Sequence, residues 1–214
     1  MTRLGCLAES ILQSLRRQRL HWLYGVRVSS SCKLGRDLDL SGNIRIGRNV
    51  TLDHGVKLTG EIAIGDNCSI GRDTQLYGNV SLAQDCVVGD HTVMSTASGA
   101  SLRVGVDTYI NSYNVIGSSA GVEIGDHCIF AAFVYITDAT HGIADLATAT
   151  KHAPISASPV RLGNNVWLGS GVMVMMGASI GNDAVVGAQS LVRDPLPDRS
   201  ISVGTPARVV RIRE

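Results

Sequence analysis

The sequence predicts an all-β protein built as a parallel β-helix, in which short strands stack and tight turns join them. Aliphatic residues recur at every sixth position over most of the chain, and the residue after them is often glycine. Helices do not repeat every six residues, whereas short strands separated by tight turns can. The composition agrees, because 24 glycines and only 4% aromatic residues suit many repeated turns around small side chains.

The size and charge of the chain limit what else it can be. Its 214 residues suffice for one domain with a core of its own. A formal net charge of +1 gives no overall field that would attract nucleic acid. No run approaches the roughly 20 apolar residues that span a bilayer, and no signal-peptide pattern opens the chain. We therefore expect a cytoplasmic protein whose thiols stay reduced.

Residues 1–27 are expected to form an amphipathic cap helix. Within residues 7–23, LAESILQSLRRQRLHWL, one face can be shared by Leu7, Ile11, Leu15 and Trp22. The arginines of this segment lie elsewhere on the helix. Two roles stay open: the helix covers the open first coil, which a solenoid requires, or it contacts a membrane surface, which its basic face would assist.

The repeat occupies residues 28–194. Stepping by six from Val28 to Met94 meets an aliphatic residue or methionine every time, and the phase resumes at Val104, Ile124 and Leu162. Three hexads make one triangular coil with one aliphatic residue per face pointing inward. The intact stretches therefore predict about eight coils, a prism roughly 38 Å tall at about 4.8 Å per strand.

Four cysteines fall at the small-residue position of a hexad, namely Cys32, Cys68, Cys86 and Cys128. We expect them to point inward as small apolar side chains. No CxxC pair occurs, which disfavours a zinc knot or a disulfide framework. After the repeat, residues 195–214 pass through Pro195, Pro197 and Pro206 and are expected to form a turn and a basic tail.

Three histidines at turn positions raise the question of a metal site. His54, His91 and His127 are separated by 37 and 36 residues, which is close to two full coils. The insertions after Met94 and Ile116 disturb that register, so we expect no metal here. A zinc-dependent activity stays as a remote alternative.

His141 stands at the longest interruption of the rhythm. The stretch DATHGIADLATATKHAPISASPV, residues 138–160, is polar and too poor in apolar residues to build a core. Insertions of this kind project from solenoids as functional loops. An imidazole is the side chain best able to accept a proton near neutral pH. We therefore expect an extended loop over residues 141–160 with a catalytic histidine at its start.

From Val104 to Arg211, about half of the chain, the sequence resembles the hexapeptide-repeat acyltransferases. Within them it is similar to the sugar O-acetyltransferase branch, which includes galactoside and maltose acetyltransferases and enzymes that acetylate bacterial surface polysaccharides. The resemblance rests on four segments in this order: TYINSYNVIG, VEIGDHCIFAAFVYITDATHG, PVRLGNNVWLGSGVMVMMGASIGNDAVVGAQSLV and VGTPARVVR. It implies a left-handed coil, an exception to the usual right-handed crossover.

The resemblance implies roles for residues near the acceptor. His141 matches the general base of the family, and Tyr109 and Asn111 match positions that contact the acceptor sugar. Asn111 also stands where the hexad usually places glycine. We place Asp138, three residues before His141, beside the acceptor, where it either orients the imidazole or caps the turn.

The resemblance also implies where the coenzyme binds. Trp167 matches a residue that lines the pantetheine channel. The backbone amide of Ser170 matches the oxyanion donor of the family, and Gly169 is the residue before it. Ala188 matches a position where the backbone meets the pantetheine arm. The cations expected near the coenzyme phosphates are Arg193, Arg208 and Arg211. Arg193 lies in AQSLVRD, where the family has a Thr-Lys pair, and the residues after His141 do not match the galactoside enzymes.

The expected activity is acetyl-CoA-dependent O-acetylation of a sugar hydroxyl, as in saccharide or bacterial surface-polysaccharide biosynthesis. His141 removes the hydroxyl proton, and transfer occurs in a ternary complex without an acyl-enzyme. The resemblance implies a homotrimer with sites between subunits, acetyl-CoA as co-substrate and no metal. The alternatives are N-acetylation of a nucleotide-linked amino sugar, serine O-acetylation, a metal protein like the γ-class carbonic anhydrases, and a non-enzymatic scaffold.

Overall fold

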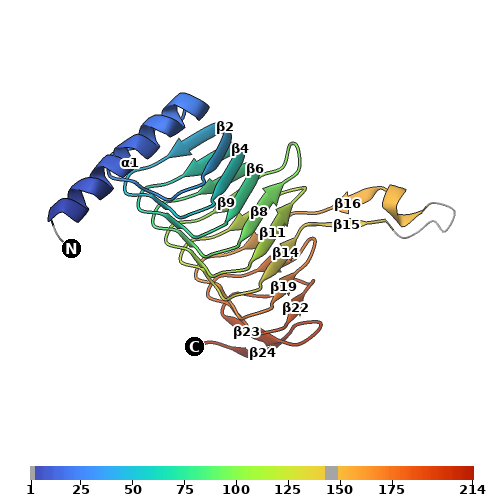
Figure 1. Cartoon of the computed structure of the whole chain (residues 1–214). Coiled ribbons are helices and arrows are strands. Elements are labelled where there is room, and N and C mark those ends of the chain that lie inside the picture. The colour runs from blue at the N-terminus through green and yellow to red at the C-terminus, as the bar shows by residue number, and fades with distance from the viewer. Residues whose placement is uncertain (1–2, 143–148) are drawn as a thin grey trace.

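The computed structural model describes residues 3–142 and 149–214 as a three-sided parallel β-solenoid with a helix across one end and an arm projecting from its middle (Figure 1). The first face is a ten-stranded sheet. Its strands, in order, are β1 (Lys33–Leu34), β3 (Thr51–Leu52), β5 (Ser69–Ile70), β7 (Val87–Val88), β10 (Tyr109–Ile110), β13 (Ile129–Phe130), β18 (Trp167–Leu168), β21 (Val185–Val186), β23 (Ser200–Val203) and β24 (Arg208–Ile212).

The second and third faces form one twelve-stranded sheet that folds around a corner. Three eight-residue strands cross both faces: β2 (Asp39–Ile46), β4 (Lys57–Ile64) and β6 (Gln75–Leu82). Later coils have separate strands on the second face: β8 (Val93–Thr96), β11 (Val115–Ser118), β14 (Tyr135–Thr137), β19 (Met173–Val174) and β22 (Leu191–Val192). Those on the third face are β9 (Leu102–Val104), β12 (Val122–Ile124), β17 (Val160–Leu162) and β20 (Ser179–Ile180).

The predicted parallel β-helix is confirmed. In the first-face sheet only β24 runs antiparallel to its neighbour, β23, so nine strands stack as parallel rungs. The hexads predicted about eight coils, and the additional rung is β23, which pairs parallel with β21. Leu196 makes a parallel bridge to Ile180, so the coil continues beyond residue 194.

Each coil turns three corners. We call the turn between the first and second faces the first corner; it comprises residues 35–38, 53–56, 71–74, 89–92, 111–114, 131–134, 169–172 and 187–190. The second corner joins the second and third faces, and the third corner returns the chain to the first face. Most turns contain a residue with positive φ, a conformation that glycine, asparagine and aspartate tolerate best.

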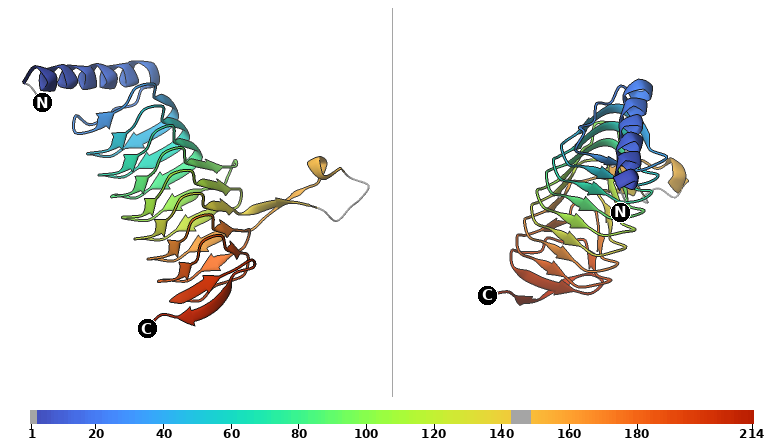
Figure 2. Two further views of the ribbon diagram at one scale, coloured as in Figure 1. Left: turned by 60° about the horizontal axis from the view of Figure 1, so that its bottom comes forward. Right: turned by 60° about the vertical axis from the view of Figure 1, so that its left-hand side comes forward.

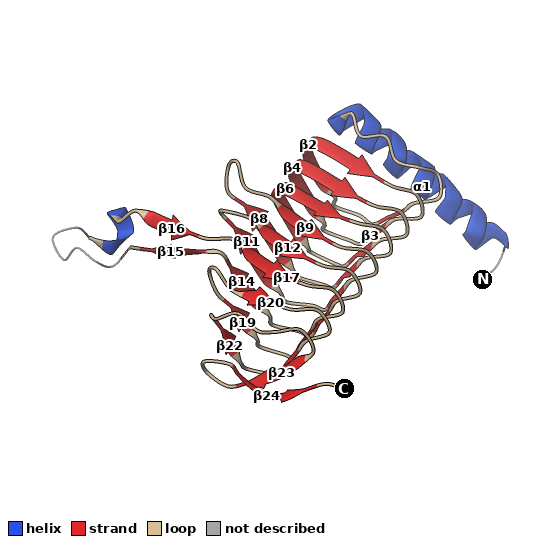
Figure 3. Ribbon diagram, turned by 180° about the vertical axis from the view of Figure 1, so that it is seen from behind, coloured by secondary structure: helices blue, strands red, loops and turns tan. Residues whose placement is uncertain are grey.

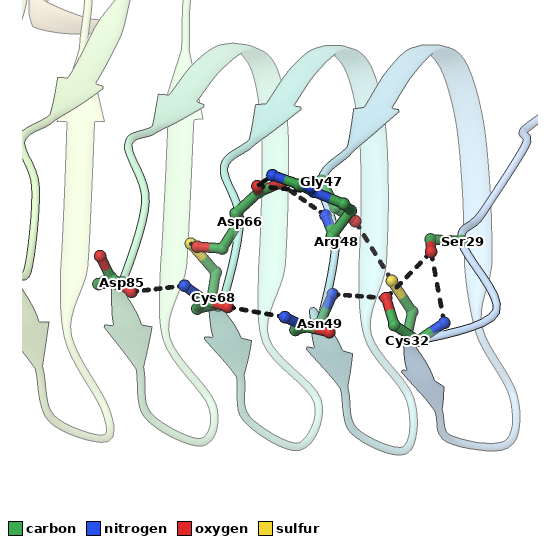
Figure 4. Close-up of polar contacts among 10 residues, drawn as sticks. Ser29, Cys32, Gly47, Arg48, Asn49, Asp66, Cys68 and Asp85 are labelled. Carbon is green, nitrogen blue, oxygen red and sulfur yellow. Dashed lines mark hydrogen bonds and ion pairs between the residues drawn. The ribbon is translucent and has the colours of Figure 1, made fainter.

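The third corner follows this rule with a ladder of polar side chains. Asn49 Nδ2 donates to Asn67 Oδ1 at 3.0 Å, and Asn67 Nδ2 donates to Asp85 Oδ1 at 2.9 Å (Figure 4). Beside the ladder, the backbone N–H and guanidinium of Arg48 donate to Asp66 and lower the pKa of that carboxyl. These bonds join successive turns at the surface.

The inward residue of each hexad is buried, and the cysteines belong to this core. Cys32, Cys68, Cys86 and Cys128 are all buried and free, as the sequence predicted. Each thiol donates to a turn carbonyl of the next rung; the Sγ to O distance is 3.2 Å from Cys32 to Gly47 (Figure 4). A hydrogen bond with Cys68, together with burial, raises the pKa of the Cys86 thiol, and burial raises that of Cys128. These thiols serve packing rather than chemistry.

The second corner is where the prism acquires its insertions. In the first three coils it is crossed by Gly42, Gly60 and Gly78, all with positive φ and stacked in register. A Cβ on Gly60 would lie 2.5 Å from the carbonyl oxygen of Gly78. In the fourth, fifth and sixth coils, longer loops replace this tight turn, at residues 97–101, 119–121 and 138–159.

The longest of these insertions forms the arm. Strand β15 (Ala139–His141) pairs antiparallel with β16 (Ile155–Ala157), and the 3₁₀ turn η1 (Thr150–His152) lies between them (Figure 3). The arm extends away from the coils, and the residues of β16 are exposed. Part of the predicted loop, residues 143–148, lies outside the described residues.

Helix α1 (Arg3–Tyr24) lies across the N-terminal end of the prism (Figure 2). Gln13 bonds both backbone groups of Leu34 in β1, with Nε2 donating to the carbonyl at 3.1 Å and the Leu34 N–H donating to Oε1 at 2.9 Å. Arg16 Nη1 donates to the same carbonyl at 2.5 Å. The helix therefore covers the open edge of the first coil, and Leu7, whose side chain the structure does not describe, lies in it.

Candidate active site

Four of the predicted site residues lie on the first corner. Asn111 belongs to the turn after β10, Gly169 and Ser170 to the turn after β18, and Ala188 to the turn after β21. The corresponding residues of successive rungs stack about 4.8 Å apart. The corner therefore brings these residues into one row along the prism.

The backbone amides of this row fall into two groups. In the five turns up to Asn111, the second turn residue donates its N–H to a side chain. These donors, with their N to acceptor distances, are Arg36 to His54 (2.9 Å), His54 to Asp53 (2.7 Å), Arg72 to Asp90 (2.8 Å), Asp90 to Ser112 (3.1 Å) and Ser112 to Asn111 (2.7 Å).

In the next three turns the same position has no acceptor. The N–H groups of Ala132, Ser170 and Ala188 make no hydrogen bond within the described part of the chain. Ser170 and Ala188 are exposed, and Ala132 is partly buried. Three donors in line can receive the oxygens of an extended ligand or of a reacting acyl group.

Ala132 is a member of this row that the sequence prediction missed. The available signal was the size of the side chains at the second turn position. Arg36, His54, Arg72 and Asp90 occupy it in the first four turns, whereas the three residues of the row are alanine or serine; Ser112 of the fifth turn is also small, but its N–H donates to Asn111. Small side chains leave the backbone accessible.

Asn111 is held in place by its own turn. Its carbonyl oxygen accepts from Asn114 Nδ2 at 2.6 Å and from Thr92 Oγ1 at 3.1 Å. Its Oδ1 accepts from the N–H of Ser112. With Oδ1 engaged, the Nδ2 group of Asn111 is the part of the side chain that can donate to a ligand.

Exposed apolar side chains flank the first corner on both sides. On the first face, Tyr109, Ile129 and Trp167 stand in register on neighbouring rungs and are 44%, 50% and 52% exposed. On the second face, Tyr135 and Met173 are likewise in register and exposed. Isolated exposed apolar residues are ordinary, but contiguous rows on adjoining faces mark a binding surface.

The turns between these rows carry aromatic rings in an unusual conformation. Tyr113 and Phe133 have φ of +63°, where bulky residues are rare. Their ring centroids are 5.3 Å apart, and His91 stacks on Tyr113 at 5.0 Å. The next residue of this column is Gly171, so no side chain covers the far side of Phe133 within the column. Strained residues of this kind cluster at functional sites.

His141 lies on the arm rather than on the first corner. Its side chain is exposed, and its backbone pairs with Ile155. All of β14, roughly 15 Å of extended chain with its flanking residues, separates the arm from the first corner. A single chain therefore does not bring His141 together with Asn111 and Ser170.

Asp138 is a structural residue, which corrects its placement beside the acceptor. It is fully buried, and its carboxylate accepts from three backbone N–H groups: Ser119 at 2.6 Å, Ala120 at 2.8 Å and Gly121 at 2.7 Å. Ser118 Oγ also bonds it at 3.2 Å. Of the two roles left open, the structure therefore favours turn capping: Asp138 fixes the base of the arm and has no exposed surface for an acceptor.

The predicted phosphate-binding arginines lie near the C-terminal end of the prism. Arg208 Nη1 donates to Asp194 Oδ2 at 2.9 Å, and Arg193 Nε lies 3.7 Å from the same oxygen. Both side chains are largely exposed, so these pairs are weak and open to exchange. Arg211 lies on β24.

The histidines considered for a metal do not converge. His54 and His91 lie on the first corner, where the Nδ1 atom of His54 accepts from the Arg36 N–H. His127 lies on the third corner, with Nδ1 3.1 Å from Asp107 Oδ2. The described residues contain no group of three or more histidine, cysteine, aspartate or glutamate side chains that could hold a metal ion.

Comparison with known proteins places this geometry in context. Residues 159–194 match the family model described as bacterial transferase hexapeptide (six repeats). A probable acetyltransferase of Mycobacterium tuberculosis is 40% identical over 118 residues, which are 55% of this chain and 39% of that protein. The galactoside O-acetyltransferase of Escherichia coli is 32% identical over 113 residues, 53% of this chain and 55% of that protein.

A solved structure shares the fold. The polysialic acid O-acetyltransferase OatWY has a TM-score of 0.65 at 22% identity, over 89% of each chain. At that identity the likeness concerns the fold alone. This chain spans about half or less of the length of the two curated relatives.

Proposed function

On the hexapeptide-repeat match over residues 159–194 and the similarity to acetyltransferases, we propose that this chain transfers an acetyl group from acetyl-CoA to a hydroxyl of a saccharide. The observation that carries the proposal is the row of three uncapped amides, at Ala132, Ser170 and Ala188, beside Asn111. The names of the relatives, acetyltransferase and galactoside O-acetyltransferase, support the reaction and the class of acceptor.

The row suits the extended arm of coenzyme A. The pantetheine arm carries amide carbonyls, which need donors, and apolar methylenes, which favour contact with Trp167. The amides of Ser170 and Ala188 provide donors on neighbouring rungs. The three predicted phosphate-binding cations lie beyond Ala188 toward the C-terminal end, at Arg193, Arg208 and Arg211. The coenzyme phosphates would replace Asp194 as the partner of Arg193 and Arg208.

The chemistry requires a base, because a neutral hydroxyl is a poor nucleophile. His141 takes the hydroxyl proton as the oxygen attacks the thioester carbon, and Asn111 Nδ2 orients the acceptor. The tetrahedral oxyanion is met by the Ser170 N–H, a contribution of about 3–4 kcal/mol for a donor of this kind. The intermediate collapses, the C–S bond breaks, and the leaving thiolate takes the proton from the imidazolium.

The site needs a second copy of the chain. His141 and the first corner are separated within one chain, so the histidine must act on a coenzyme held by the first corner of a neighbour. In a closed ring of identical chains, the first corner of each chain meets the His141 arm of one neighbour. The assembly that we propose is a homotrimer. Apolar rows flanking the first corner support burial against a neighbour.

The acceptor we propose is a sugar hydroxyl in saccharide or surface-polysaccharide biosynthesis. At a membrane, an acceptor of this class would be a lipid-linked saccharide. The element that we propose to contact the membrane is α1. Among the described residues, no helix is long and apolar enough to cross a bilayer.

The test is release of coenzyme A from acetyl-CoA in the presence of galactosides and of polysaccharide fragments. His141→Ala should lower kcat about 10²-fold or more, as for loss of a general base. The matched control is His152→Ala, which removes another exposed histidine of the same arm and should leave turnover unchanged. Near-normal turnover by His141→Ala with an accepted saccharide would refute the assignment.

A further inference from the structure

We propose that the outward face of α1 is a lipid-binding surface, which sets the N-terminal end of the prism against an anionic membrane. The first indication is the way the helix docks. An amphipathic helix that caps a solenoid ordinarily buries its apolar face. Here the orientation is largely reversed.

The face of α1 that meets the first coil is mainly polar. Gln13, Arg16 and Arg17 are partly buried there, and all three bond backbone groups between Ser30 and Leu34. This docking satisfies backbone groups at an exposed strand edge, which apolar side chains could not do. Leu20 is the large apolar side chain of the described helix residues that is fully buried.

The opposite face is apolar and exposed. Successive residues of a helix are 100° apart, which places its large apolar side chains within one arc. Those exposed by 45% or more are Ile11, Leu12, Leu15, Trp22 and Leu23, and Trp22 reaches 87%. The prism does not bury these side chains. A contiguous exposed apolar face of this kind indicates a surface that binds a partner.

Charge favours a lipid surface over a second copy. Arg16 and Arg17 bond the first coil, but Arg19 is exposed and falls within the apolar arc, contrary to the expectation that the arginines lie elsewhere, and residues 10–24 contain no acidic residue. Two helices packed through this face would bring Arg19 of each copy into a shared apolar interface without a carboxylate from this segment to pair it. An anionic membrane supplies both the apolar depth and the opposite charge, and tryptophan is enriched at such interfaces.

The position of the helix also suits a planar partner. It lies across the N-terminal end of the prism (Figure 2), and Gln13 and Arg16 attach it to β1, so its opposite face is turned away from the coils. If the three prisms of the proposed ring stand side by side with parallel axes, three such helices lie at one end. Weak insertion of each helix would then add up to stronger binding.

This orientation sets how far from the membrane the acetylated sugar would lie, an inference that rests on the proposed function. The Asn111 turn belongs to the fifth rung of the first-face sheet, so it stands roughly 20 Å above the first coil at about 4.8 Å per rung. The thickness of α1 adds about 10 Å. A membrane-bound acceptor would therefore be reached several sugars out along a saccharide chain rather than next to the lipid.

The experiment is sedimentation of the full chain with vesicles of phosphatidylcholine, with and without phosphatidylserine. Wild-type protein should bind the anionic vesicles and lose binding at high salt. The variant Leu15→Gln/Trp22→Gln should bind about tenfold more weakly. The matched control is Val210→Gln, which alters a side chain that is 61% exposed on β24 at the other end of the prism.

The outcomes separate cleanly. Unchanged vesicle binding by the double variant overturns the proposal, and so does absence of wild-type binding. A change in oligomeric state by analytical ultracentrifugation, without vesicle binding, assigns the face to a second copy and overturns it too. Acetyl transfer to a water-soluble galactoside should be equal in wild type and double variant, so a failure of the proposed activity would appear separately, as absence of transfer by both.

Discussion

At Ser170 the functional group is the backbone N–H rather than the hydroxyl. Ser170 is followed by Gly171, which has a φ of +69°. In turns with a positive φ at this position, proline is favoured at the residue before it, which here is Ser170. Because the Ser170 N–H has no acceptor in the described chain, proline removes a donor without breaking an internal bond.

Ser170→Pro should therefore fold normally and lower kcat about 10²–10³-fold, the usual effect of losing an oxyanion donor. Ser170→Ala is the control, since it keeps the N–H and should keep most of the activity. Steady-state kinetics and thermal melting of both variants make the comparison. Equal activity of the proline and alanine variants would rule out a role for this amide.

Sequence reasoning identified some of these residues and missed others for physical reasons. It located Ser170 and Ala188 through a resemblance in the surrounding segments. It missed Ala132, because an amide is free only when the side chains of its own and neighbouring turns cannot reach it, and that depends on three-dimensional stacking. It left the role of Asp138 undecided, because nothing in the residue order reveals the three N–H groups that its carboxylate caps.

At the scale of elements, the second corner accounts for both the regular and the irregular part of the prism. Gly60 has φ of +108°, and a Cβ there would lie 2.5 Å from the Gly78 carbonyl oxygen. Both the backbone conformation and the close approach of the next rung require glycine. Where the corner is lengthened instead, the chain gains a loop, and the longest loop bears His141.

Gly60→Ala should lower the free energy of unfolding by about 3 kcal/mol or more, because backbone strain and a clash with the next rung add together. Gly99→Ala is the matched control. Gly99 also has positive φ, +83°, but a Cβ there would meet nothing within 4 Å, so about 1–2 kcal/mol of strain is expected. Denaturant unfolding compares the two; equal losses would contradict the stacked-glycine explanation.

The elements differ in how far the sequence could predict them. The six-residue rhythm identified the strands, the inward cysteines and the position of the arm, because each depends on local alternation around a repeated turn. The helix itself was also predictable from its periodicity. Its docking through Gln13 and Arg16 was not, because it depends on unpaired backbone groups of β1, which only the folded edge presents.

At the scale of the whole molecule, the proposed catalysis depends on a site divided between chains. The first corner offers donors and apolar walls, and the arm offers an imidazole, yet β14 keeps them apart in one prism. The residues alone could suggest both halves but not their separation, because distance along a coil is invisible until the coils are stacked. Assembly is therefore a requirement of the proposed reaction rather than an addition to it.

Mixing two inactive variants tests this claim most directly. His141→Ala and Asn111→Ala should each be nearly inactive alone. If every site joins the histidine of one chain to the asparagine of its neighbour, oligomers reassembled from equal amounts of the two should recover about a quarter of wild-type turnover by random pairing. Mixed oligomers, verified by mass spectrometry, that stay inactive would contradict the account, because His141 and Asn111 would then have to act within the same chain.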